Sequence, residues 1–237
     1  MKRYVLGLDY GTNSMRAVVV NLLTAREVIE LVENYPSGKD GVILDHKNAH
    51  LARQNPADYL YCLEKIGKNL TKLMKRKGIK SEDVVGIGID TTGSTPIPVD
   101  ENLVPLVMKR EFRNNKNAMA WLWKDHTSAD EAEEITNLAK KIRPEYLSKI
   151  GGVYSSEWFF SKILHLARTD KKVFEASASF VELCDFIPAI LTGCTSPSQV
   201  LRSICAAGHK AMYNPQWGGL PDEKFLEMLD PSFKNLR

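Results

Sequence analysis

The chain opens with two short apolar runs on either side of a polar turn. Residues 4–8 are rich in β-forming side chains, and residues 17–20 are an unbroken apolar run typical of a buried strand. A third run with partial alternation covers residues 27–35. Three strands before any helix predict an antiparallel start to a sheet.

The strongest helical pattern lies between Asn55 and Gly78. Asn55 is a favourable N-cap, Pro56 suits the first helical position, and Gly78 ends the pattern. An apolar run at residues 84–90 follows and predicts a strand buried on both faces. A helix that leads into another strand next to antiparallel strands indicates a mixed sheet in an α/β fold. One apolar stripe at helical spacing supports the helix: Leu60, Leu63, Ile66, Leu70, Leu73 and Met74.

The rest of the chain predicts shorter elements. Ser155 or Ser156 is a candidate N-cap for a helix that runs to Ala167. The patterns also predict a hairpin with arms at 97–99 and 104–108, helices at 117–127, 129–141, 172–177, 186–191 and 221–229, and a strand at 180–185.

Composition excludes several classes of protein. With 237 residues, 43% of them hydrophobic, the chain can bury one large core or two small ones. A net charge of +3 with dispersed basic residues argues against nucleic acid as a partner. The four cysteines form no C-x-x-C pair, and no apolar run approaches the length of a membrane span. We therefore expect a soluble cytoplasmic protein without a membrane partner.

The turn between the first two strands has the residues of an anion-binding site. Such a turn aims backbone N–H groups at one spot, and its polar side chains add further donors. Asp9, at its mouth, is placed to hold a hydrated Mg²⁺, a cation that prefers carboxylate and water oxygens. An ordinary hairpin turn also accounts for these residues. The candidate phosphate ligands are Gly11, Thr12, Asn13, Ser14 and Arg16.

Three further positions are candidates for binding a small hydroxylated ligand. Gly93 lies in the polar run 90–95 after an apolar strand, where ligands of open α/β sheets bind, although the run could simply turn the chain. Trp123 offers a flat wall for the face of a sugar, or it is an ordinary core tryptophan. Lys210 follows the small residues 206–208, which leave it room to enter a cleft, although most lysines are solvated.

The segment 9–16, Asp-Tyr-Gly-Thr-Asn-Ser-Met-Arg, resembles the first phosphate loop of the FGGY family of sugar kinases. Four segments downstream match members that phosphorylate L-ribulose, although Thr91 replaces an aromatic residue of the pattern. These are residues 90–96, 122–126 (Leu-Trp-Lys-Asp-His), 151–162 and 201–213. The resemblance covers the chain from residue 5 to its end, and the agreement of separated motifs in one order is far more specific than any single motif.

That resemblance implies a fold and an activity. The family belongs to the actin/Hsp70/hexokinase superfamily, which implies a ribonuclease H-like α/β lobe over residues 1–237, with a mixed sheet and helices on both faces. The implied reaction is ATP-dependent, Mg²⁺-assisted phosphorylation of a ketopentose, most simply L-ribulose in arabinose catabolism. Phosphorylation of xylulose or glycerol by another kind of FGGY kinase, and sugar binding without catalysis, are the alternatives.

The resemblance also assigns roles. The 11–14 turn with Arg16 would cradle phosphates, Asp9 would hold Mg²⁺ through water, and Gly93, Trp123 and Lys210 would bind the sugar. The aspartate that acts as general base in the family has no counterpart here, so we expect it beyond Arg237, in a C-terminal lobe that also binds ATP. The chain is thus predicted to be a first lobe, inactive alone, with its own second lobe as partner; a homodimer stays open.

Overall fold

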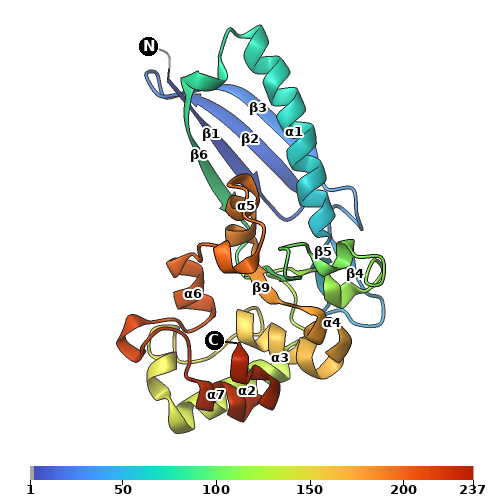
Figure 1. Cartoon of the computed structure of the whole chain (residues 1–237), viewed down its shortest axis with the longest axis vertical. Coiled ribbons are helices and arrows are strands. Elements are labelled where there is room, and N and C mark those ends of the chain that lie inside the picture. The colour runs from blue at the N-terminus through green and yellow to red at the C-terminus, as the bar shows by residue number, and fades with distance from the viewer. Residues whose placement is uncertain (1–2, 237) are drawn as a thin grey trace. The chain divides into compact units, whose positions relative to one another are not determined.

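The computed structural model describes residues 3–236, which form two compact units (Figure 1). The first unit contains residues 3–43 and 54–92, and the second contains residues 44–53 and 93–236. None of the helices in this range combines the length and the apolar character that a membrane span requires.

The first unit is built on a four-stranded mixed sheet in the order β3-β2-β1-β6. β1 (Tyr4–Tyr10), β2 (Ser14–Asn21) and β3 (Arg26–Asn34) are antiparallel, whereas β6 (Val84–Thr91) runs parallel to β1. The three predicted N-terminal strands and the mixed sheet are therefore confirmed. In this register Asp9 lies between Arg16 on β2 and Asp90 on β6.

Helix α1 (Pro56–Arg76) covers one face of this sheet over β2 and β3 (Figure 1). Its predicted ends are confirmed, because the Asn55 side chain accepts a hydrogen bond from the N–H of Ala57, and Gly78 has a φ of 62° just after the helix. The stripe of the helix and one face of the sheet form an apolar core of Tyr4, Val19, Ile29, Leu70 and Ile79. Side chains alternate along a strand, so Asp9 and Arg16 lie on the opposite face.

β6 is not buried on both faces as the sequence predicted. It is the last strand in the sheet order, and Val85 and Ile87 remain 49% and 55% exposed. The apolar composition of residues 84–89 was read as a sign of a central strand. A strand at the edge of a sheet pairs on one side only, and α1 lies over β2 and β3, so these side chains stay open to solvent within this unit.

The second unit combines two small sheets with six helices. β7 (Pro96–Val99) pairs with β9 (Ser179–Glu182), and β4 (Ile43–Leu44), β5 (Ala52–Gln54) and β8 (Ala120–Trp121) form the other sheet. The helices are α2 (Ala129–Ile142), α3 (Phe159–Thr169), α4 (Lys171–Ala176), α5 (Leu183–Leu191), α6 (Ile204–Lys210) and α7 (Glu223–Leu229). Short 3₁₀ turns lie at Ser81–Asp83 in the first unit and, in the second, at Leu106–Met108, Lys116–Ala118, Pro144–Leu147, Pro197–Gln199, Pro215–Trp217 and Pro231–Asn235.

The predicted helix at 117–127 is wrong, because buried side chains hold this segment in another form. Trp121 is 2% exposed and packs under the Arg53 guanidinium, whose carbon lies 3.4 Å from the ring centre. Arg53 also forms a buried ion pair with Asp125. Asp125 accepts hydrogen bonds from the backbone N–H of Ala52 (2.7 Å) and from the Thr127 hydroxyl (2.6 Å). The contacts of this segment with Ala52 and Arg53 are non-local, and they replace the local bonds of a helix.

Two further predictions need correction. The turn of the predicted hairpin is confirmed, because the N–H of Asp100 donates to the carbonyl of Val104 at 3.0 Å and Val99 and Pro105 form an antiparallel bridge. Its second arm is wrong beyond that bridge: residues 106–108 form a 3₁₀ turn, and β7 has the distant β9 as its strand partner. α3 begins at Phe159, so neither serine is its N-cap; Ser155 instead accepts a bond from the N–H of Glu157. The predicted helices that became α2, α4, α5 and α7 are confirmed.

We expect Asp222 to stabilise the second unit through its charge. It caps α7 through the N–H of Phe225 and accepts bonds from Arg143 (2.5 Å) and Tyr146 (2.8 Å). Although burial opposes them, these donors lower the pKa of Asp222 to about 2. Asp222→Asn should lower the free energy of unfolding at pH 7 by about 1–2 kcal/mol, measured by urea denaturation.

The pH dependence of that loss tests its origin. A lowered carboxyl pKa stabilises the fold above the unfolded pKa near 3.8, and the contribution disappears as the pH falls through about 2. The difference between wild type and Asp222→Asn should therefore shrink across this window. Glu227→Gln, an exposed change on the same helix, is the control and should have little effect. A difference that stays constant with pH would contradict the assignment.

Candidate functional site

The predicted phosphate turn is held from within the first unit by buried side chains. The N–H of Gly11 closes the turn on the carbonyl of Ser14 at 3.0 Å, and a Cβ on Gly11 would lie only 3.3 Å from that oxygen. The Gln54 amide donates to the carbonyl of Thr12 at 2.8 Å, and the buried Tyr59 hydroxyl donates to Gln54 at 2.6 Å. These hydrogen bonds therefore hold the backbone of the turn in one conformation.

The polar side chains of the turn differ in their surroundings. The side-chain amide of Asn13 donates to the backbone carbonyl of Asp40 at 2.5 Å, and the backbone carbonyl of Asn13 accepts the N–H of Tyr35 at 3.0 Å. Ser14 is 8% exposed, at the start of β2. Asn13 therefore helps to hold the neighbouring loop in this structure, in addition to the phosphate role predicted for it.

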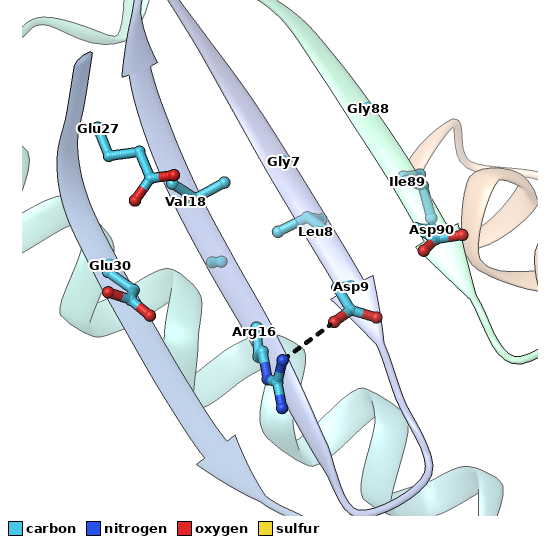
Figure 2. Close-up of a pocket in the computed structure, with 11 residues that line it drawn as sticks. Gly7, Leu8, Asp9, Arg16, Val18, Glu27, Glu30, Gly88, Ile89 and Asp90 are labelled. Carbon is cyan, nitrogen blue, oxygen red and sulfur yellow. Dashed lines mark ion pairs between the residues drawn. The ribbon is translucent and has the colours of Figure 1, made fainter.

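Asp9 and Arg16 lie together on the sheet face that α1 leaves open (Figure 2). Their side chains are 43% and 64% exposed, and Arg16 Nη1 lies 4.0 Å from Asp9 Oδ2. They line a shallow hollow of about 430 Å³ with Gly7, Glu30 and Asp90. A Cβ on Gly7 would lie 3.0 Å from the Val18 side chain, so a larger residue at position 7 would crowd Val18 at the base of the hollow.

The donor set around Asp9 fits Mg²⁺ held mainly through water. Residues 3–236 contain no cluster of three or more histidine, cysteine or acidic side chains that could hold a metal by themselves. Asp9 and Asp90 are register partners on adjacent parallel strands, and both follow apolar runs at the carboxyl ends of those strands. One or two carboxylates completed by water and phosphate oxygens are the usual protein environment of Mg²⁺. The sequence analysis did not place Asp90 here, although two aspartates that end parallel strands could have indicated it.

In the second unit, the structure brings Gly93 and Lys210 together from distant parts of the chain. A Cβ on Gly93 would lie 3.3 Å from Lys210 Nζ and 3.6 Å from its Cε, so the ammonium lies directly over the glycine backbone. Lys210 ends α6 and lines a cavity of about 360 Å³, together with Glu182, Asp185 and Arg202. This cavity mixes charges of both signs with apolar side chains, which range from alanines to Phe159 and Phe180.

Trp123, the third predicted sugar ligand, lies in the loop after β8 and is 41% exposed. It is not among the described residues that line the cavity beside Lys210. The structure therefore groups Gly93 with Lys210, and it leaves Trp123 on the 120–127 segment as an exposed ring.

Two charged residues next to this cluster were not predicted as site residues. Lys162, from α3, and Glu182, at the end of β9, are 1% and 6% exposed. Burial lowers the pKa of Lys162 to about 7, an effect that the Glu182 carboxylate opposes, and burial raises the pKa of Glu182. Lys162 is the last residue of the matched motif 151–162, and Glu182 lies in an apolar strand, so neither was predicted as a site residue. Only the fold shows that both meet the turn next to Gly93.

Comparison with known proteins assigns the family. Residues 4–236 match the N-terminal domain of the FGGY family of carbohydrate kinases, and the chain belongs to that family. It is 42% identical to a ribulokinase of Vibrio parahaemolyticus and 38% identical to one of Shouchella clausii. Both matches cover 100% of this chain and 41% of the relative. The chain therefore spans about two fifths of the length of these curated relatives.

Solved structures agree with this assignment at the level of the fold. A gluconate kinase and a ligand-bound xylulose kinase, both from Lactobacillus acidophilus, superpose with TM-scores of 0.66 at 16% identity. The matches cover 97% and 99% of this chain and 40% and 41% of those chains. The predicted α/β fold of the actin and hexokinase type is confirmed.

The proximity of Gly93 to Lys210 predicts a specific response to a methyl group. In Gly93→Ala the new Cβ should displace the flexible end of Lys210 by a few tenths of an ångström and leave the stability within about 1 kcal/mol of wild type. With ¹³C-labelled lysine in the chain, the ¹³Cε resonance of Lys210 should shift. This resonance is assigned as the one that Lys210→Arg removes. Gly67→Ala, where nothing lies within 4 Å of the new Cβ, is the control. An unchanged Lys210 resonance in Gly93→Ala would contradict the described contact.

Proposed function

We propose that this chain is the N-terminal, sugar-binding lobe of an ATP-dependent ketopentose kinase whose acceptor is L-ribulose. The observation that carries the proposal is the similarity to ribulokinases along the whole chain, together with the pairing of Gly93 and Lys210. Both residues lie in segments that resemble the substrate-binding motifs of those kinases. Xylulose and glycerol are the competing acceptors within the family.

The sugar is bound in the second unit. Lys210 has a flexible stem and three N–H donors, and it donates to a hydroxyl of the ketose. The absent side chain at Gly93 lets the backbone approach the sugar closely. Trp123, exposed on its loop, packs against C–H groups of the sugar.

The phosphates of ATP are bound in the first unit. The 11–14 turn supplies backbone and hydroxyl donors, and Arg16 supplies a charge on an exposed, open face of the sheet. Bound Mg²⁺ would be held by Asp9 through water and would neutralise charge on the phosphates. Gln54 and Tyr59 keep the turn in place, so that it need not reorganise when the nucleotide binds.

Phosphoryl transfer also needs a group that accepts the proton of the sugar hydroxyl. The motif that carries this aspartate in the family was not found in the chain, and the ribulokinase relatives are more than twice as long. We therefore place the general base and the adenosine site in a C-terminal lobe that completes the enzyme. Closure of the lobes would exclude water, which competes with the sugar as acceptor.

The first prediction from this proposal concerns the chain alone. It should bind L-ribulose weakly, measured by saturation-transfer NMR, and should form no ADP above background. A chimera with the part of the Vibrio parahaemolyticus ribulokinase that this chain does not match should regain ADP formation that depends on L-ribulose. Asp9→Ala in the chimera should remove that activity. L-ribulose-dependent turnover by the chain alone, or a chimera that prefers xylulose or glycerol, would contradict the proposal.

The second prediction concerns Lys210. In the chimera, Lys210→Met keeps most of the apolar stem and removes the donor and the charge. Loss of a charged hydrogen bond costs roughly 1.5–3 kcal/mol, or about 10- to 150-fold in kcat/KM for the sugar. The KM for ATP should stay nearly unchanged. Lys224→Met, at an exposed position of α7, is the matched control. A Lys210→Met enzyme with wild-type kcat/KM for L-ribulose would show that this lysine is not a sugar ligand.

A further inference from the structure

The buried ammonium of Lys162 binds two segments that carry predicted sugar ligands. Its Nζ donates to the carbonyl of Ser94 at 2.7 Å and to the carbonyl of Leu122 at 2.9 Å, with the carbonyl of Trp121 at 3.3 Å. Ser94 directly follows Gly93, and Leu122 directly precedes Trp123. One side chain of α3 thus joins the 93–95 turn to the 120–123 segment.

Glu182 binds the same turn from its other side. Its Oε2 accepts the N–H of Thr95 at 2.7 Å, and the carbonyl of Thr95 accepts the N–H of Leu183 at 3.1 Å. The two consecutive backbone groups between Ser94 and Thr95, a carbonyl and an N–H, are therefore held by a buried cation and a buried carboxylate. The Thr95 hydroxyl also donates to the carbonyl of Gly93 at 3.2 Å, so the turn held by these two side chains carries Gly93 with it.

The turn is held in a conformation that it would not adopt freely. Ser94 has a φ of 54°, a left-handed value that strains a residue other than glycine. Its hydroxyl is buried and has no hydrogen-bond partner among the described residues, as is also true of Glu182 Oε1. Strain of this kind persists only where the surroundings over-determine the backbone, and Lys162 and Glu182 provide that here.

The helix that carries Lys162 also holds Lys210. The N–H of Phe160, in the first turn of α3, donates to the Tyr154 hydroxyl at 2.9 Å, and that hydroxyl donates to the backbone carbonyl of Lys210. α3 therefore fixes both sides of the Gly93–Lys210 contact, one through Lys162 and the other through Tyr154.

Stability alone does not account for burying these charges. Removing charged side chains from water is costly, and apolar replacements of similar size are frequently neutral or stabilising. The two side chains place their charges on the turn of the candidate sugar site, whereas an apolar pair would leave the Ser94 carbonyl and the Thr95 N–H without these bonds. The effect of these two charged side chains in the structure is therefore to hold that turn in place.

We propose that Lys162 and Glu182 are positioning residues of the sugar site: they act through the backbone groups that they bind, and they set the distance between the Gly93 backbone and the Lys210 ammonium. This inference rests on the proposed function, because it assigns the fixed distance to recognition of the sugar. It also extends the site to α3 and to the end of β9, neither of which the sequence analysis included.

The test compares two readouts in the 237-residue chain. The first is hydrogen exchange of the Thr95 amide, which reports on the turn without any ligand. The second is the affinity for L-ribulose, from NMR titration. In Lys162→Met the Thr95 amide should exchange at least 10-fold faster, and the affinity for L-ribulose should fall about 10-fold. Asp222→Asn, a destabilising change away from the turn, is the control for a general loss of stability and should alter neither readout beyond its effect on unfolding.

Each outcome decides the inference. Effects in Lys162→Met no larger than in Asp222→Asn would overturn it, as would faster Thr95 exchange with unchanged affinity, which would make the role purely structural. If Lys162→Met does not fold, Glu182→Gln applies the same criteria with a smaller expected effect, at least threefold in both readouts, because the amide oxygen still accepts from Thr95. Wild-type chain that does not bind L-ribulose would refute the proposed function itself, and the inference with it, before any variant is compared.

Discussion

The interaction on which the second unit depends most is the buried ammonium of Lys162 among backbone carbonyls. A charge at a site that is 1% exposed is tolerated only when its donors are satisfied, and here three backbone carbonyls accept them while the negative charge of Glu182 favours the ammonium. The carbonyls come from the turn that contains Ser94 and from the end of β8 with the residue after it, Leu122. Buried backbone carbonyls need hydrogen-bond donors, and the lysine supplies them to both segments at once.

The first unit supports its candidate site in a different way. Its turn lies between two strands of one sheet, and neutral groups hold it: Gln54 donates to the carbonyl of Thr12, and Tyr59 orients Gln54. The charged groups, Asp9 and Arg16, stay on the exposed face of the sheet. Polyphosphate and a hydrated cation are themselves highly charged, and an exposed site accepts them with less desolvation than a closed one. A sugar, which is neutral, suits the more enclosed cluster around Lys210.

How much the sequence could predict depended on how local each signal was. The N-terminal strands and α1 carry their own information in an apolar pattern, an Asn55 cap and a terminal Gly78, and these were predicted correctly. The segment 117–127 has helix-forming composition, but its structure is decided by Arg53, whose bond to Asp125 joins distant parts of the chain. The same limit hid the site contacts: Lys162 and Glu182 meet the 93–95 turn only in the folded chain. The resemblance to family motifs selected Gly93 and Lys210, which the structure brings together. It could do so because a family motif carries information about the three-dimensional fold, whereas periodicity carries information about local structure.

The central claim is that the sugar is recognised by the 93–95 turn and Lys210, and the phosphates by the turn after β1. The most direct measurement is a map of amide chemical-shift changes in ¹⁵N-labelled chain titrated separately with L-ribulose and with MgATP. The account predicts that L-ribulose first perturbs the amides of residues 93–95 and 206–211, and that MgATP first perturbs those of residues 9–16. Perturbations by L-ribulose that centre on residues 9–16, or that spread over surfaces outside both clusters, would contradict it.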